Sequence, residues 1–159
     1  MKKFICALLC ILFLSGCYGK SVTPVIKNLT YRAHIFYYDE EYECLVKVEK
    51  DGKMTFCIDG GTLDGFTTVF DKDKITCSYL GKETTLSKNF YKGALTSIFE
   101  MNESLTDKKA INKSGKCIIE GRTNSGEYTL FLSGTGLPLC AELDGRDFYV
   151  DFYDVNIVN

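Results

Sequence analysis

The amino-terminal residues combine a reactive side chain with the pattern of a targeting segment. Met1-Lys2-Lys3 is a short positive stretch, and Phe4 to Leu14 is an uninterrupted apolar run, followed by the small residues Ser15 and Gly16. This order is typical of a signal peptide. The apolar run is shorter than the ~20 residues that a helix needs to span a bilayer. The thiol of Cys17 therefore follows directly on a segment that we expect to be removed.

Leu14-Ser15-Gly16-Cys17 resembles the lipobox of bacterial lipoproteins. The resemblance implies that a diacylglycerol is joined to the Cys17 thiol and that the chain is cleaved just before this residue. Residues 1–16 are then a signal peptide, and residues 17–25 are a short polar tether on a lipid anchor with acyl chains such as palmitate. The implied location is the extracytoplasmic face of the cell membrane. The alternatives are an ordinary secretory signal with a chance cysteine and a segment that is wholly retained.

The other cysteines of the mature chain are Cys44, Cys57, Cys77, Cys117 and Cys140, and no two of them have the Cys-X-X-Cys spacing. The strand pattern described below puts three of them on the apolar face of a sheet and leaves Cys57 and Cys140 on the polar face. We expect buried free thiols that behave as small apolar residues. A disulfide between two inward-facing thiols is the alternative.

Few residues could carry acid–base or metal chemistry. His34 is the only histidine, so a catalytic triad or a histidine-rich metal site has little to be built from. The carboxylates between Asp39 and Glu43 lie in or beside a predicted hairpin turn and lack the ligand spacing of a calcium loop. We therefore expect no enzyme activity, no metal and no cofactor. Tyr149 and Tyr153 are the best candidates for an exposed glycan-stacking surface, with ordinary surface tyrosines as the alternative.

The composition sets the class of protein in which these residues are placed. The chain has 159 residues and a formal net charge of −2, with 45% hydrophobic and 25% charged residues. This length is typical of one domain, and the composition excludes a disordered polymer. A chain without an excess of basic residues is not expected to bind nucleic acid. We expect residues 26–159 to form a single β-rich domain.

From Ile26 onward the apolar residues alternate with polar ones, and turn residues interrupt the alternation at short intervals. This pattern predicts about ten antiparallel strands in a meander. The predicted turns are Asp39-Glu40, Lys50-Asp51-Gly52, Lys72-Asp73, Gly81-Lys82, Asn124-Ser125 and Asp144-Gly145. The alternation predicts buried side chains at Val46, Phe56, Leu130, Leu139 and Val150. It predicts outward side chains at Arg32, His34, Lys47 and Glu49.

One segment departs from the period of two. Between Ser87 and Asn102, apolar residues form a two-wide stripe that predicts a helix near 88–102, with Ser87 as its N-cap. A ten-stranded sheet with one apolar face must curl, and this helix is available to fill it. The predicted fold is mainly β: a curled antiparallel meander, or incomplete β-barrel, wrapped around one amphipathic helix. The polar stretch from Glu103 to Gly115, with several lysines, is predicted to be a surface connection.

This order of elements over residues 26–157 resembles the lipoprotein-carrier superfamily, which includes LolA-like and LolB-like proteins and LppX-like lipoproteins. The resemblance implies a concave cavity that holds acyl chains, with the helix residues Phe90, Leu95, Ile98 and Phe99 lining it. The first hypothesis is therefore a non-catalytic carrier or binder of a hydrophobic ligand. The alternative is a cell-surface module that binds a protein or a glycan through its polar face or a sheet edge. The volume of the interior distinguishes the two.

Overall fold

The computed structural model describes residues 21–88, 93–113 and 116–158. Within these residues the chain forms eleven strands, one α-helix and a short 3-10 helix, η1 (Gly61–Leu63). The strands are β1 (Leu29–Tyr37), β2 (Glu40–Val48), β3 (Met54–Ile58), β4 (Thr67–Asp71), β5 (Lys74–Tyr79), β6 (Lys82–Ser87), β7 (Ile111–Lys113), β8 (Lys116–Thr123), β9 (Gly126–Leu132), β10 (Pro138–Leu143) and β11 (Phe148–Ile157). The helix is α2 (Ala94–Ser104).

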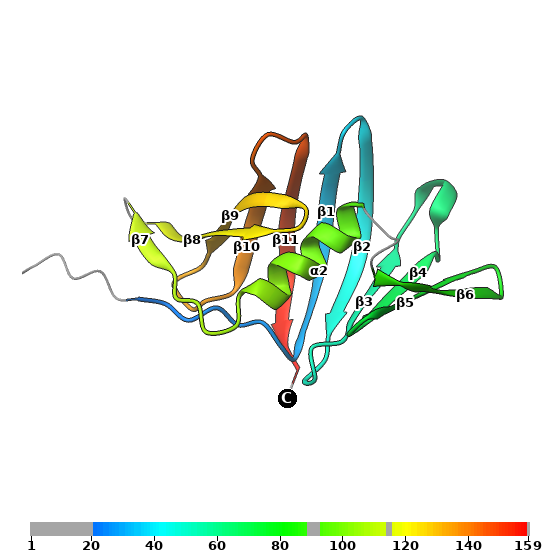
Figure 1. Cartoon of the computed structure of the whole chain (residues 1–159), viewed down its shortest axis with the longest axis horizontal. Helices are drawn as coiled ribbons and strands as arrows, with labels where there is room; N and C mark the ends of the chain where they lie inside the picture. Colours follow the sequence, from blue (N-terminus) through cyan, green and yellow to red (C-terminus); the bar gives the residue numbers. More distant parts are fainter. Residues whose placement is uncertain (1–20, 89–92, 114–115, 159) are drawn as a thin grey trace, which may run out of the picture.

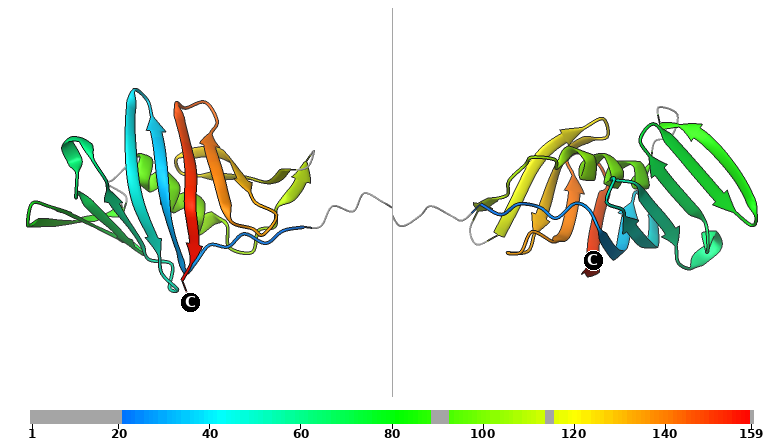
Figure 2. Two further views of the ribbon diagram at one scale, coloured as in Figure 1. Left: turned by 180° about the vertical axis from the view of Figure 1, so that it is seen from behind. Right: turned by 90° about the horizontal axis from the view of Figure 1, so that it is seen from below.

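All eleven strands belong to one antiparallel sheet in the order β6-β5-β4-β3-β2-β1-β11-β10-β9-β8-β7. The sheet therefore consists of two meanders, which the pairing of β1 with β11 joins at the centre. The sheet is not closed into a barrel, and β6 and β7 are its edge strands. It curls around α2, which lies on its concave side (Figures 1 and 2). The predicted fold, a curled antiparallel meander around one helix, is confirmed.

The concave face holds the apolar core. Val46, Phe56, Leu130 and Val150 are buried, as the alternation predicts. Arg32, His34, Lys47 and Glu49 keep partly or fully exposed side chains. The cysteines also follow the alternation, because Cys44, Cys77 and Cys117 are buried and the other two described cysteines are half-buried. All five are free thiols, so the prediction of unpaired cysteines is confirmed and the alternative of a disulfide among them is wrong.

Of the six hairpins with the turns named above, three have the predicted register and three are displaced. A seventh prediction, that the loop over Ser133 to Gly136 sets Leu132 against Leu137, is also wrong, because Leu132 faces Pro138. The pairs Val46↔Phe56, Phe70↔Ile75 and Ile119↔Leu130 form as predicted. In β1–β2, Ala33 faces Cys44, whereas the prediction placed Ile35 there. In β5–β6, Ile75 faces Leu86, whereas the prediction placed Cys77 there.

Two of the displaced turns place a residue other than Asp, Asn or Gly at a positive φ angle. Tyr38 and Leu80 adopt positive φ angles of 56° and 47°, so they occupy turn positions that the sequence suggests for Asp, Asn or Gly. The third displaced hairpin is β10–β11, where Ala141 pairs with Val150. Its connection runs from residue 144 to residue 147, and the Asp147 carbonyl accepts a bond from the Tyr38 amide. Each register moves by two residues, which leaves every side chain on its predicted face.

Leu139 is the buried position that was predicted wrongly. It is 48% exposed. The register between β9 and β10 shifts between Pro138 and Cys140, so Leu139 is the extra residue of a β-bulge. A bulge interrupts the inward–outward alternation of side chains. The alternation is correct for the rest of the strand pair, but it gives the wrong face for the extra residue.

The helix begins later than predicted, and Ser87 is not its cap. Ser87 ends β6 and pairs with Lys74, while Gly93 precedes the first turn of α2. The β-branched residues Thr84 and Thr85 favour the strand β6, which continues through Ser87, the predicted cap. Toward its other end α2 continues to Ser104, and β7 then lies within the segment that was predicted to be an irregular connection.

Residues 21–25 form what we call the amino-terminal strap, which lies against the domain although the sequence predicts a polar tether over residues 17–25. The Ala110 amide donates to the Val22 carbonyl at 2.8 Å, and the Val25 amide donates to the Gly136 carbonyl at 2.9 Å. Pro24 is buried. The strap packs because three of its five residues, Val22, Pro24 and Val25, are apolar.

Candidate functional site

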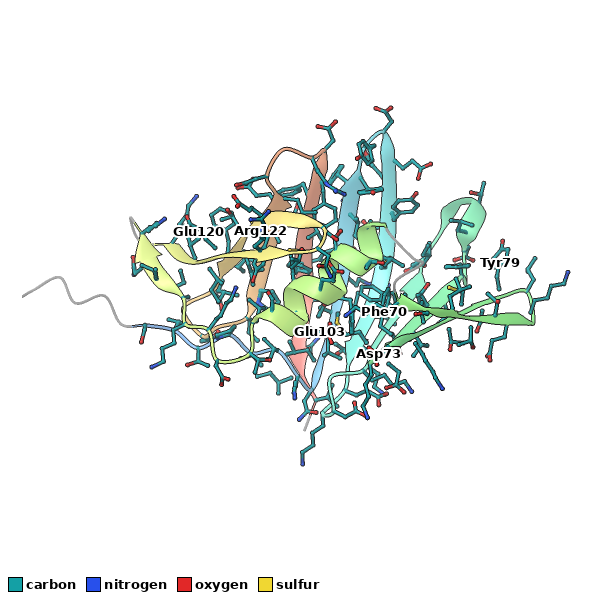
Figure 3. All side chains as sticks on the ribbon, viewed as in Figure 1. Phe70, Asp73, Tyr79, Glu103, Glu120 and Arg122 are labelled. Carbon is teal, nitrogen blue, oxygen red and sulfur yellow. The ribbon has the colours of Figure 1, made fainter. Side chains whose placement is uncertain are left out.

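The helix side chains predicted to fill the sheet do so. Leu95, Ile98 and Phe99 are 6%, 2% and 1% exposed and face the concave side of the sheet. The Phe99 ring stacks on Phe70 of β4 with 4.8 Å between ring centroids. Phe70 is labelled in Figure 3. Phe90 and Cys17, the other predicted site residues, lie outside the described residues.

An apolar gap lies between α2 and the sheet at the carboxy-terminal half of the helix. Ile98, Met101 and Leu105 form its helix side, and Pro24 and Val25 of the strap border it. The sheet side consists of Leu29, Tyr31, Leu130, Leu132, Pro138 and Phe152. The gap measures about 30 Å³, which is close to the volume of one water molecule. The interior is therefore closed in this conformation, and the strap covers the gap from one side.

Hydrogen bonds attach α2 to the β8–β9 hairpin. The Glu100 carboxylate accepts bonds from the Ser125 amide at 3.1 Å and from the Ser125 hydroxyl at 3.0 Å. Nearer the end of the helix, the Ser104 hydroxyl lies 2.6 Å from the hydroxyl of Tyr128, which also accepts a bond from Lys108. On the opposite side α2 meets β4 through the stacked rings of Phe99 and Phe70. The helix is therefore hydrogen-bonded to the carboxy-terminal half of the sheet and packed through aromatic rings against the amino-terminal half.

The buried ionisable groups near the gap stay in their neutral forms. Burial raises the pKa of Tyr31 above its ordinary range, with a smaller effect from the Cys44 thiol. Burial likewise raises the pKa of Cys44 to about 12. A thiol that keeps its proton is a poor nucleophile, so Cys44 contributes packing to this part of the core.

A second hollow lies on the outer side of β2, beside the part of β2 that extends past the end of β3. It measures about 440 Å³, and its lining includes His34, Glu41, Glu43 and Asp59. The two ring nitrogens of His34 lie 3.5 Å from a carboxylate oxygen of Glu41 and of Glu43. Next to the hollow, the Arg32 guanidinium is 2.8 Å from Asp59.

The outer face continues the polar contacts of this hollow. The Tyr153 hydroxyl donates to Glu43, and this bond raises the pKa of Tyr153. Tyr149 and Tyr153 are 36% and 37% exposed, so the two tyrosines lie on the outer face as predicted. No serine or cysteine is among the residues that line the hollow, so the described residues place no nucleophile of those types beside His34.

The described part of the chain has neither a candidate metal site nor a candidate membrane-spanning helix. It contains no group of three or more His, Cys, Asp or Glu side chains that could hold a metal ion. Among the same residues, no helix has the length and apolar character needed to cross a membrane.

The sequence reasoning missed the strap and the outer hollow. A signal for the strap exists in Val22, Pro24 and Val25, whose apolar character is unusual for a free tether. The hollow has no local signal, because β3 and β2 are of unequal length and the hollow exists only once they are paired. Residues from β1, β2 and the loop after β3 meet there.

Comparisons with known proteins complete the description of the site. No protein-family model matches the chain, and no curated protein matches it. A solved structure that is similar is a LolA superfamily protein from Nitrosomonas europaea, with a TM-score of 0.48 and 9% sequence identity. The alignment covers 86% of this chain and 89% of that chain.

Proposed function

We propose that this chain is a non-catalytic, lipid-anchored protein of the extracytoplasmic membrane face that binds a hydrophobic ligand between α2 and the concave sheet. The observation that carries the proposal is the apolar gap beside Ile98, which sheet, helix and strap border together. An acyl chain is apolar, as are most of the side chains that line the gap. Palmitate or a related acyl group on Cys17 provides the anchor that the lipobox implies.

The ligand enters by displacing the strap and separating α2 from β1 and β11, since about 30 Å³ is too small for an acyl chain. Two backbone hydrogen bonds hold the strap, at Val22 and Val25. A hydrogen bond of this kind contributes about 1 kcal/mol net, so releasing the strap costs little compared with unfolding the domain. The apolar surface that is uncovered is then covered again by the ligand.

Titration with a fluorescent fatty acid tests this proposal. Ile98→Phe adds volume on the helix side of the gap and is expected to weaken binding of the fatty acid strongly. Leu45→Phe is the matched control, because Leu45 is 50% exposed on the outer side of β2 and binding should not change. Equal binding by the two variants, with unchanged melting temperatures, would place the ligand elsewhere.

Cys17→Ser tests the anchor. The variant lacks the thiol that would carry the lipid, so we expect an unprocessed precursor of higher mass in place of the mature, lipidated chain. Mass spectrometry of the chain extracted from membranes measures both species. A Cys17→Ser chain that is still cleaved before residue 17 and still carries a lipid mass would refute the assignment.

The second candidate is a surface module that binds a protein or glycan through its polar face. The volumes favour it, because the outer hollow beside His34 measures about 440 Å³ against about 30 Å³ inside. A module of this kind takes up no fatty acid, and Glu43→Gln changes its partner binding while Ile98→Phe does not.

A further inference from the structure

An exposed apolar row crosses the outer face of the carboxy-terminal half of the sheet. Ile111 of β7 pairs with Ile118 of β8, which pairs with Phe131 of β9. Phe131 in turn faces Cys140 of β10, next to the bulge residue Leu139. Ile111 is 63% exposed and Leu139 is 48% exposed, while Ile118 and Phe131 are half-buried. We call Ile111, Ile118, Phe131 and Leu139 the apolar row.

The corresponding outward-facing row in the amino-terminal half of the sheet consists mainly of threonines. There Thr55 faces Val69, Val69 faces Thr76, and Thr76 faces Thr85. Three of these four outward side chains carry a hydroxyl group. Leu45 is also exposed on the outer face, but its cross-strand partner there is Cys57 of β3, so it does not belong to a comparable apolar row. A continuous exposed apolar row requires an explanation, because such patches mark sites of contact.

Lysines border the apolar row. Lys109, Lys113 and Lys116 are exposed, and the Lys116 ammonium lies 5.6 Å from the centre of the Phe131 ring. The Lys113 ammonium pairs with Glu120 at 2.6 Å; Glu120 is labelled on β8 in Figure 3. Apolar side chains beside flexible ammonium groups are the combination that binds the interface of an anionic bilayer.

The apolar row also lies near the end of the chain that would carry the lipid. Val22 of the strap forms a bridge with Ala110, the residue before β7. Cys17 is four residues before Ser21. Four residues reach at most about 14 Å, at ~3.5 Å for each. A lipid on Cys17 therefore keeps the β7 side of the domain close to the bilayer.

We propose that the outer face of β7 to β10 rests on the membrane surface, with the apolar row at the level of the glycerol groups and Lys109, Lys113 and Lys116 on lipid phosphates. This inference rests on the proposed anchor, which sets the orientation of the domain. It adds a second contact with the membrane, made by folded side chains. The concave side and α2 are on the other face of the sheet and stay accessible.

The absence of tryptophan from the chain makes a direct test possible. The full lipidated chain with Ile111→Trp is reconstituted into vesicles of phosphatidylcholine and phosphatidylglycerol with brominated acyl chains. We expect its emission to move to shorter wavelength and to lose most of its intensity relative to vesicles without bromine. Leu80→Trp is the matched control, because Leu80 is 83% exposed at the tip of the β5–β6 turn and its emission should not change.

Replacing Lys109, Lys113 and Lys116 together by Gln in the Ile111→Trp chain should restore most of the emission while the anchor keeps the chain on the vesicles. Circular dichroism melting verifies that each variant is folded. Sedimentation with the vesicles without quenching at Ile111→Trp would overturn the docking face and leave the anchor standing. Failure of the chain to sediment would overturn both proposals.

Discussion

Gly136, in the connection between β9 and β10, lies directly against the strap. Its φ of +86° favours glycine, and a Cβ added there would lie 2.2 Å from the Thr23 carbonyl oxygen. We expect Gly136→Ala to displace the strap, so that the Val25 amide loses its protection from hydrogen exchange and the fatty acid binds more readily. The matched control is Gly52→Ala, which has a similar φ of +92° but no heavy atom within 4 Å.

The two glycine variants separate backbone strain from the loss of strap contact. Each puts a Cβ into the left-handed region, at a cost of about 1–2 kcal/mol. Only Gly136→Ala also has the clash with Thr23. If the Val25 amide stays protected equally in both variants, the strap is not a movable cover of the gap.

The buried Cys44 thiol is expected to make the domain less stable as the pH becomes alkaline. Its pKa is raised from 9.0 to about 12 by burial, so the folded chain keeps this proton while the unfolded chain releases it. The stabilisation is complete below pH 9 and is lost as the pH rises toward about 12, by up to ~1.4 kcal/mol for each pH unit. Tyr31, whose pKa is also raised by burial, acts in the same direction.

Urea midpoints measured across this pH range verify the effect. Cys44→Ala should flatten the alkaline decrease in stability, whereas Cys57→Ala, on the outer face, should leave it nearly unchanged. An identical decrease in wild type and in Cys44→Ala would show that other groups are responsible.

At the scale of elements, α2 has two kinds of buried residue. Leu95 packs in the core away from the gap, and Ile98 lines the gap. Leu95→Ala should cost about 2–5 kcal/mol, as truncations in closed cores do. Ile98→Ala should cost less than Leu95→Ala, because it enlarges a space that a bound ligand can fill. Denaturant midpoints and dye binding for both variants measure the difference.

The contrast between the two helix variants decides between the candidate functions. Equal destabilisation by Leu95→Ala and Ile98→Ala, with no dye bound by either, would describe a solid core and contradict the ligand site. A smaller loss of stability for Ile98→Ala that is recovered when fatty acid is added would support it.

How much of the fold could be predicted depends on the element. The alternation of side chains is local, and it identified the concave face and the buried positions Val46, Phe56, Leu130 and Val150. Turn positions occupied by Tyr38 and Leu80, and the bulge at Leu139, are set by tertiary contacts that outweigh local preference. The pairing of β1 with β11 joins residues more than a hundred positions apart, so no local pattern indicates it.

The candidate site was predicted in part. The helix stripe correctly indicated Leu95, Ile98 and Phe99 as buried residues, but of these three only Ile98 lines the gap, whereas all three were predicted to line a cavity. The sheet side of the gap comes from β1, β9, β10 and β11, and the strap completes it. These segments meet only after the central pairing of β1 with β11, which explains why the sequence suggested helix residues alone.

At the scale of the whole molecule, the open sheet presents two different faces. The concave face is covered by α2 and the strap, and the outer face has a polar part around His34 and an apolar part on β7 to β10. In our account the strap connects these features, because it follows the anchor, lies next to β7 and covers the gap. The strap then links the anchor to the entry of the ligand, although the membrane lies against the outer face and the ligand binds on the concave face.

Native mass spectrometry of the chain extracted from membranes tests the central claim, which is the binding of a hydrophobic ligand beneath α2. Wild type is compared with Ile98→Phe, so that a covalent lipid on Cys17 is common to both chains. We predict that wild type carries an additional hydrophobic mass that dissociates on collisional activation, and that Ile98→Phe lacks it. An additional mass that is present in both chains or in neither, with neither chain binding added fatty acid, would contradict the account.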